Sequence, residues 1–272
     1  MALTEFQRDI CRLLAAHRIR NGESYVAGGA ALNEILRAPR VSRDLDLFHD
    51  TAAALATAWT ADRKELEAAG YSVSVVRERP TFVEVEVVRG SEAVTIQWTQ
   101  DSAFRFFPLV EHAELGLTLH PFDLATNKVL AMVGRLEPRD WVDVVACDNG
   151  IQPLGYLAWA ACGKDPGFSP MSILDQAARA SRYAPAEMVG LAFEGTPPDV
   201  VALSQQWHAA LDAAREIVDR LPAEKAGTAV LSREGDLFRG NASALSAALA
   251  QRSIAFHDGA VRGAFPQIVS RA

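Results

Sequence analysis

Two runs of sequence decide the fold: Tyr25-Val-Ala-Gly28-Gly29-Ala-Ala-Leu32 and, shortly after it, Arg40-Val-Ser42-Arg43-Asp44-Leu-Asp46-Leu-Phe48. The first run has the pattern of a short apolar strand, a turn at two glycines and the start of a helix. Glycine has no Cβ, so this turn can be sharp and can approach a ligand closely. Free N–H groups at a helix start favour an anion such as a phosphate. The first run therefore predicts a phosphate-binding turn.

The second run places Asp44 and Asp46 at positions i and i+2 of a predicted strand. Their side chains would project from one face, with Cα atoms about 6.5 Å apart, and we expect Leu45, Leu47 and Phe48 on the opposite face. Two carboxylates on one face repel each other unless a cation lies between them. Mg²⁺ held by carboxylates and substrate phosphates is the usual solution. Either run alone is also typical of an ordinary turn or a helix cap, whereas the combination predicts metal-assisted phosphoryl or nucleotidyl transfer.

The composition of the 272 residues is that of a globular protein, with 49% hydrophobic and 22% charged residues. The net charge of −7 argues against a general nucleic-acid binder, although it leaves room for a local basic patch. Three scattered cysteines make no disulfide framework. The first residues lack a signal-peptide core, and no apolar run approaches the ~20 residues that span a membrane. We therefore expect a cytoplasmic protein without a membrane partner.

Periodicity predicts helices, then strands, then helices along the chain. A helix is expected over 3–19, and another from a cap at Asp50-Thr51 to residue 69. Alternating apolar residues predict an antiparallel meander of strands over 71–76, 81–88 and 93–99. Further helices are predicted over 124–134, 138–148, 154–161, 170–180, 186–191, 198–221 and 241–255, with a hairpin over 229–238. The six histidines have no metal-ligand spacing, so zinc is not expected, and His49 is predicted to lie on the surface.

A second group of charged residues occupies the predicted helices over 124–134 and 138–148. It consists of Lys128, Arg135, Arg139, Asp140 and Asp143. The short Leu136-Glu137 connection would make the two helices neighbours, and the spacings would bring the charges onto facing sides. A lysine can hold a triphosphate as a point charge, but a structural ion-pair network fits the same pattern. Arg37, Arg40 and Arg43, just before the aspartates, are either phosphate contacts or part of a solvated face.

Both groups together, over roughly residues 25–148, resemble the AbiEii-type nucleotidyltransferases, the toxin components of type IV toxin–antitoxin systems. The resembling segments are Ala27-Gly-Gly-Ala-Ala-Leu, Arg43-Asp44-Leu-Asp46-Leu-Phe, Lys128-Val-Leu-Ala131 and Arg139-Asp140-Trp-Val-Asp143. The resemblance implies an α+β fold, in which a polymerase-beta-like core with a mixed sheet flanked by helices precedes a mostly helical C-terminal region. Residues 1–120 would form the core, and residues 121–272 would complete the active site and the acceptor cleft.

The resemblance also implies roles for individual residues. Gly28 and Gly29 would hold the phosphates of an NTP (ATP, GTP or CTP), with Arg43 and Arg135 as further nucleotide contacts. Asp44 and Asp46 would bind Mg²⁺, Lys128 would contact the phosphates, and Asp143 and Asp140 would complete the catalytic set. The enzyme would move an NMP to a hydroxyl of an acceptor, either the 3′ end of tRNA or a protein, and a cognate antitoxin would neutralise it.

Two departures from the family pattern leave other functions open. Gly29 stands where a serine is frequent, and the expected third carboxylate is missing, since Thr95 and Gln97 hold the outward positions of the third strand. Glu86 or Asp101 would have to substitute. One alternative is therefore a nucleotide-binding protein with weak or no catalysis. Another is a small-molecule nucleotidyltransferase of the antibiotic-modifying kind, because the acidic net charge suits a cationic acceptor.

Overall fold

The computed structural model describes residues 3–181, 183 and 185–267. The chain divides into two compact units. The first consists of Met1–Ala103, Pro108–His120 and Ala192–Gly195, and the second of Phe104–Phe107, Pro121–Leu191 and Thr196–Ala272. The first unit holds a mixed sheet with helices and the second is mostly helical, which confirms the predicted α+β fold. None of the helices in the described part of the chain is both long and apolar enough to cross a membrane.

The sheet of the first unit has seven strands in the order β3-β4-β5-β2-β1-β8-β7. The strands are β1 (Ser24–Ala27), β2 (Asp44–His49), β3 (Ser72–Arg79), β4 (Phe82–Arg89), β5 (Glu92–Gln100), β7 (Val110–His112) and β8 (Gly116–Thr118). The pairs β2–β5 and β1–β8 are parallel, and the other neighbours are antiparallel. The predicted meander of β3, β4 and β5 is confirmed. The strands β7 and β8 were not predicted, because they are only three residues long.

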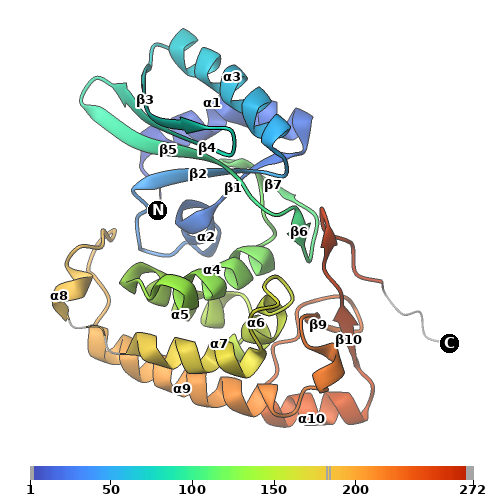
Figure 1. Cartoon of the computed structure of the whole chain (residues 1–272). Helices are drawn as coiled ribbons and strands as arrows, with labels where there is room; N and C mark the ends of the chain where they lie inside the picture. The colour runs from blue at the N-terminus through green and yellow to red at the C-terminus, as the bar shows by residue number, and fades with distance from the viewer. Residues whose placement is uncertain (1–2, 182, 184, 268–272) are drawn as a thin grey trace. The chain divides into compact units, whose positions relative to one another are not determined.

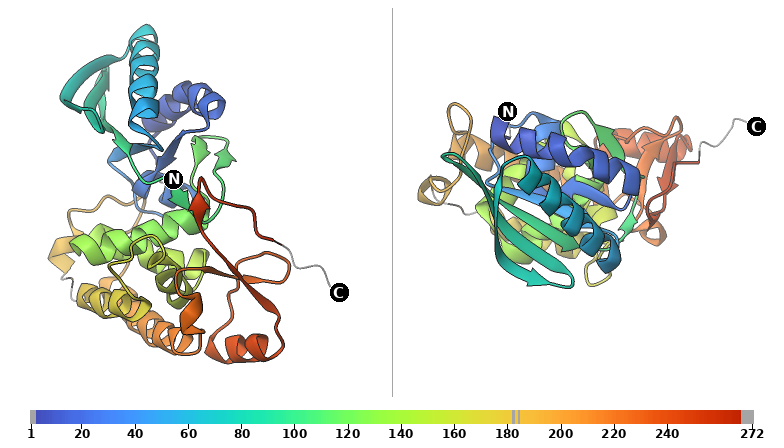
Figure 2. Two further views of the ribbon diagram at one scale, coloured as in Figure 1. Left: turned by 45° about the vertical axis from the view of Figure 1, so that its right-hand side comes forward. Right: turned by 90° about the horizontal axis from the view of Figure 1, so that it is seen from above.

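Three helices flank this sheet: α1 (Glu5–Asn21), α2 (Gly28–Leu36) and α3 (Ala52–Ala68). Their ends follow local chemistry, since Thr51 caps the start of α3 and Gly22 ends α1 in the left-handed conformation. Figures 1 and 2 show α1 and α3 on one face of the sheet and α2 on the other. Trp98 of β5 points towards α3, where its Nε1 donates to the Asp62 carboxylate at 2.9 Å.

Two residues of β2 lie on a different face from the one expected. Phe48 shares the face of Asp44 and Asp46, because side chains alternate along a strand, and its ring stacks on Tyr25. His49 therefore falls on the α3 face and is fully buried, which contradicts the surface position predicted for it. Burial lowers the pKa of His49 to about 4, so this imidazole is neutral at physiological pH.

The second unit is built mainly from helices. They are α4 (Pro121–Arg135), α5 (Pro138–Gly150), α6 (Leu154–Ala161), α7 (Pro170–Ala177), α8 (Pro185–Met188), α9 (Val200–Val218) and α10 (Ala242–Ala250), with the short 3-10 helices η1 (Ala178–Ser181) and η2 (Ala223–Lys225). Figure 1 shows α7 and α9 side by side. The all-buried helix α6 lies at the centre of this packing. The three cysteines of the chain are free, as predicted.

The end of the chain differs from the prediction. The helix expected over 241–255 ends at Ala250, and Ile254–His257 form strand β10 instead. This strand pairs antiparallel with β9 (Ala229–Ser232). The hairpin expected over 229–238 has one antiparallel bridge, between Leu231 and Leu237, with a backbone hydrogen bond from Phe238 to Val230. The partner of β9 is distant in sequence, and local pattern does not reveal such a partner.

A buried carboxylate helps to hold the segment Phe104–Phe107 within the second unit. Asp123, at the start of α4, accepts hydrogen bonds from the backbone N–H groups of Phe106 (2.8 Å) and Phe107 (3.0 Å). Its Oδ1 also lies 2.7 Å from Nζ of Lys164. The segment further pairs as strand β6 (Phe104–Arg105) with β11 (Ala260–Val261). Asp123 thus satisfies three donors at a position that water does not reach.

We predict that Asp123→Ala lowers the free energy of unfolding by about 3 kcal/mol, because it removes the counter-ion of the Lys164 ammonium and the side-chain acceptor of two buried N–H groups. Chemical denaturation of the whole chain would measure this loss. The control is Asp175→Ala, which removes a carboxylate that is 69% exposed and pairs with Arg215. The free energy of unfolding of this control variant is expected to fall by less than about 1 kcal/mol. Equal losses in the two variants would contradict the structural role of Asp123.

Candidate active site

The glycine turn and the aspartate strand meet in the first unit. Gly28 begins α2 with φ of 68°, a left-handed conformation that glycine tolerates. The preceding residue, Ala27, pairs with Asp46 across β1 and β2. A Cβ added to Gly28 would overlap the carboxylate of Asp46. Gly28 is therefore required twice, for its backbone conformation and for the space that Asp46 occupies.

Asp44 and Asp46 share the face of the sheet that α2 covers. Both are half-buried, while Leu45 between them and Leu47 after them are buried on the opposite face. The aspartates are thus held by a strand whose other face packs in the core. Such a strand fixes the separation of the two carboxylates, because moving one would require moving the buried leucines. The alternation along β2 predicted this arrangement.

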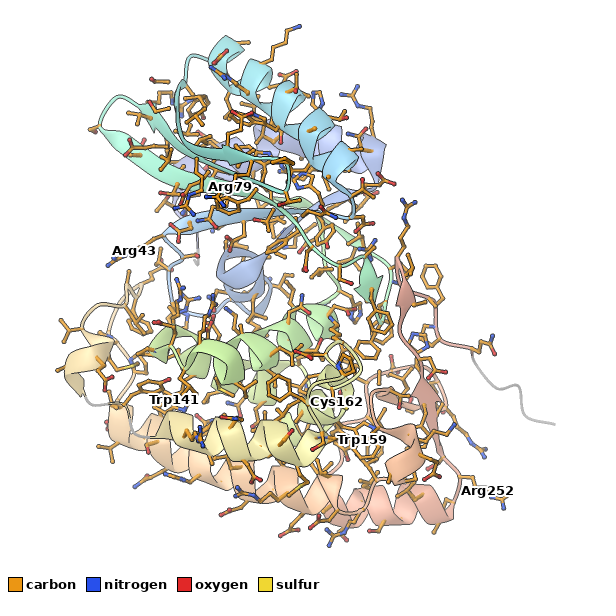
Figure 3. The ribbon with its side chains drawn as sticks, viewed as in Figure 1. Arg43, Arg79, Trp141, Trp159, Cys162 and Arg252 are labelled. Atoms are coloured by element: carbon orange, nitrogen blue, oxygen red, sulfur yellow. The ribbon has the colours of Figure 1, made fainter. Side chains whose placement is uncertain are left out.

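The arginine closest to the glycine turn is Arg40, not Arg43. A Cβ on Gly29 would lie 2.5 Å from Nη2 of Arg40, and the side chain of Arg40 is buried. Backbone pairing of Arg40 with Phe193 helps to fix this loop within the first unit. Arg43 is exposed, and Figure 3 shows it extending outward from the loop before β2. The resemblance selected Arg43 and not Arg40, and the loop around Pro39 has no periodicity from which the arginines could have been ranked.

The second charged group lies entirely in the second unit, and four of its members form a network of ion pairs. Nζ of Lys128 is 3.0 Å from Oδ1 of Asp140 and 3.1 Å from Oδ2 of Asp143. Arg135 donates to Asp140 through Nε (2.6 Å) and Nη2 (2.9 Å). The tight Leu136-Glu137 connection, with Leu136 at φ of 52°, makes α4 and α5 adjacent, as predicted. The exposed Arg139 makes no ion pair with the described residues.

This network determines the protonation of Asp140 and the orientation of Lys128. Burial raises the pKa of Asp140, but the hydrogen bond and charge of Arg135, together with the charge of Lys128, outweigh burial and bring the pKa below its ordinary value. The ammonium group of Lys128 has three N–H donors. Two of them face Asp140 and Asp143. Lys128 therefore keeps one N–H donor that these aspartates do not use.

The carboxylates of the first unit fit a magnesium ion better than a structural zinc ion. The described residues hold no group of three or more His, Cys, Asp or Glu side chains that could bind a metal. Mg²⁺ is commonly held by one or two carboxylates, with substrate phosphates and water as its other ligands. Asp44 and Asp46, on one strand face beside a phosphate-type turn, supply that donor set.

Comparison with protein families gave one match. The family model described as "Nucleotidyl transferase AbiEii toxin, Type IV TA system" matches residues 12–158, which is more than half of the chain. This match includes every residue of both charged groups. None of the curated proteins compared with this chain matches it in sequence.

Solved structures show the same fold at low sequence identity. A candidate nucleotidyltransferase from H. pylori is 11% identical with a TM-score of 0.53, over 80% of this chain and 99% of that chain. MenT4, a nucleotidyltransferase toxin from Mycobacterium tuberculosis, is 13% identical with a TM-score of 0.53, over 80% and 84% of the two chains. JHP933 from Helicobacter pylori is 12% identical with a TM-score of 0.50, over 80% and 95%. These likenesses concern the fold alone.

We predict that Gly28→Ala destabilises the protein more than Gly22→Ala does. Both glycines have nearly the same φ, 68° and 65°, but nothing lies within 4 Å of a Cβ at Gly22. The Gly22 variant should therefore show only the cost of the left-handed conformation, about 1 kcal/mol. The free energy of unfolding of the Gly28 variant should fall by a further ~1–3 kcal/mol, because the new Cβ collides with the carboxylate of Asp46. Chemical denaturation would measure both, and equal losses would show that the turn does not touch the carboxylate.

We also predict a pH-dependent contribution of Asp140 to stability. Because the pKa of Asp140 is lowered in the folded state, the unfolded chain binds the proton more tightly. The stabilisation is therefore complete above about pH 5 and is lost as the pH falls below about 4. The free energy of unfolding of Asp140→Asn should lie about 3 kcal/mol below that of the native protein at pH 7, and the gap should narrow at pH 3. A gap of constant size would contradict the ion-pair origin.

Proposed function

This chain belongs to the AbiEii nucleotidyltransferase toxin family of type IV toxin–antitoxin systems, and we propose that it moves an NMP from an NTP to an acceptor hydroxyl with the help of Mg²⁺. The observation that carries this proposal is the contact between the glycine turn and Asp46. It supports the proposal because the glycine turn and a carboxylate lie within one small region of the first unit. Phosphoryl chemistry needs both, because a polyphosphate must be bound and its charge neutralised.

In this proposal the chain's own residues bind and orient the nucleotide. The backbone at Gly28 and Gly29 holds phosphates of the NTP, with Arg43 as a further contact, and the buried Arg40 gives the turn a positive charge. Asp44 and Asp46 hold the magnesium ion. When bound, Mg²⁺ supplies positive charge to the phosphates and fixes their geometry.

The residues of the second unit contribute to the same reaction in our proposal. Lys128 offers its remaining donor to a phosphate oxygen, and Arg135 is a second nucleotide contact. Asp143 and Asp140 hold Lys128 in place. Residues 1–120 thus act as the nucleotidyltransferase core, and residues 121–272 complete the site and bind the acceptor.

The reaction is a substitution at the α-phosphorus. An oxygen of the acceptor hydroxyl forms a bond to the α-phosphorus and loses its proton to solvent. The bond between the α-phosphorus and the oxygen bridging to the β-phosphorus breaks, and pyrophosphate leaves with that electron pair. We propose the 3′ end of tRNA or a protein as the acceptor and a cognate antitoxin as the protein partner. The membership of a toxin–antitoxin family supports the antitoxin.

We predict that Asp44→Asn and Asp46→Asn each lower the transfer rate more than about 100-fold, because each removes a charge that holds Mg²⁺. The purified protein would be incubated with Mg²⁺, each α-labelled NTP, total RNA and cell extract. Label in a tRNA or protein band, dependent on both aspartates and lost with EDTA, is the expected result. Glu92→Gln, an exposed acid at the start of β5, is the control and should keep full activity.

Two other outcomes would redirect the proposal. NTP binding without label in any acceptor would support a nucleotide-binding protein that does not catalyse transfer. Label on an aminoglycoside added in a parallel reaction, but not on RNA or protein, would identify a small-molecule nucleotidyltransferase. Label that persists in both aspartate variants would refute the assignment of the catalytic metal ligands.

A further inference from the structure

A row of polar side chains crosses four neighbouring strands of the first unit. Strand register aligns Asp46 of β2 with Gln97 of β5, Gln97 with Glu84 of β4, and Glu84 with Arg77 of β3. Residues aligned in this way lie on the same face of a sheet. Figure 3 labels Arg79, two residues beyond Arg77 at the end of β3. The carboxylate of Asp46 is therefore the first member of a continuous polar row.

The amide of Gln97 is held in one orientation by Glu84. Nε2 of Gln97 donates to Oε1 of Glu84 at 3.1 Å. An ionised carboxylate only accepts hydrogen bonds, so the amide nitrogen, and not the amide oxygen, must face Glu84. Both side chains are half-buried, which strengthens their interaction relative to one in bulk water.

This orientation leaves the amide oxygen free of Glu84. In the strand order, β4 and β2 lie on opposite sides of β5. The oxygen and nitrogen of an amide point in different directions from the same carbon, so Oε1 of Gln97 is not engaged in the contact with Glu84 of β4. Oε1 of Gln97 accepts no hydrogen bond from the described residues.

We propose that Glu84 is a positioning residue that turns Oε1 of Gln97 towards Asp46, and that Gln97 is thereby a neutral third oxygen donor to the divalent cation held by Asp44 and Asp46. This inference rests on the proposed function. Amide oxygens are suitable ligands for hard cations. A neutral donor also adds no further negative charge to that of the two carboxylates.

Neither of the other acids considered from the sequence has this geometry. Glu86 aligns with Thr95 and Ser74, in the neighbouring row that begins at Asp44, and it is exposed. Asp101 lies beyond the end of β5, where its carboxylate accepts from the backbone N–H of Ser102 at 2.7 Å. Glu86 is therefore the matched control for Glu84, since both are glutamates on the same face of β4.

The test measures the affinity of the full-length protein for Mn²⁺ in the presence of a non-hydrolysable NTP analogue. Electron paramagnetic resonance reports the fraction of Mn²⁺ that is bound. Removing a residue that orients a metal ligand typically costs about 10–100-fold in metal affinity. Gln97→Ala and Glu84→Ala should each weaken Mn²⁺ binding at least about tenfold. Glu86→Ala should bind as the native protein does, and Asp46→Ala should bind least.

The outcomes separate this inference from the proposed function. If Asp46→Ala binds Mn²⁺ as tightly as the native protein, the assignment of the metal site to Asp44 and Asp46 is refuted. If Asp46→Ala fails to bind but Gln97→Ala and Glu84→Ala stay within twofold of the native protein, only the third donor is refuted. If Glu86→Ala and Glu84→Ala lose the same amount of Mn²⁺ affinity, Glu84 does not position Gln97. The loss would then come from a general effect of acidic charge on the sheet. Thermal melting of each variant would confirm that it is folded.

Discussion

The candidate site depends on the absence of a single carbon atom, the Cβ of residue 28. The carboxylate of Asp46 occupies the volume that this atom would fill, so the glycine turn and the aspartate strand can approach only because residue 28 is glycine. The antiparallel pairing of β1 with β2 sets this approach, since it places Ala27 opposite Asp46. A phosphate bound by the turn would therefore lie beside a carboxylate. Such a placement is unfavourable unless a cation separates the two negative charges.

The division of the sheet into two faces makes this site rigid. On one face, Leu45, Leu47 and Trp98 are buried against α3, and their packing fixes the register of β2 against β5. On the other face the same register aligns Asp46 with Gln97 and Glu84. A slip of one residue would expose the leucines and bury the aspartates, so the cost of losing the core protects the geometry of the site. The core thus determines where the polar row stands.

Sequence reasoning identified the features with a local cause. The period of two in β2 fixes the common face of Asp44 and Asp46, and the short connection between α4 and α5 brings Lys128 to Asp140. The alignment of Gln97 with Glu84 was missed, because it depends on the pairing of β4 with β5 and not on any local motif. Arg40 was not distinguished from Arg43 for a similar reason, since its burial results from tertiary contacts of an irregular loop. Features fixed by distant partners leave no periodic signal in the chain.

The two charged groups have different electrostatic roles. Lys128 and Arg135 balance Asp140 and Asp143, so the network of the second unit is neutral and buried apart from Arg135. Lys128 therefore has an N–H donor in a fixed position but contributes little net positive charge, because Asp140 and Asp143 already neutralise its ammonium group. Asp44 and Asp46 carry two negative charges on the half-buried face that would receive a polyanionic nucleotide. In our proposal, a cation bound by Asp44 and Asp46 would offset the repulsion between these carboxylates and the phosphates of the nucleotide.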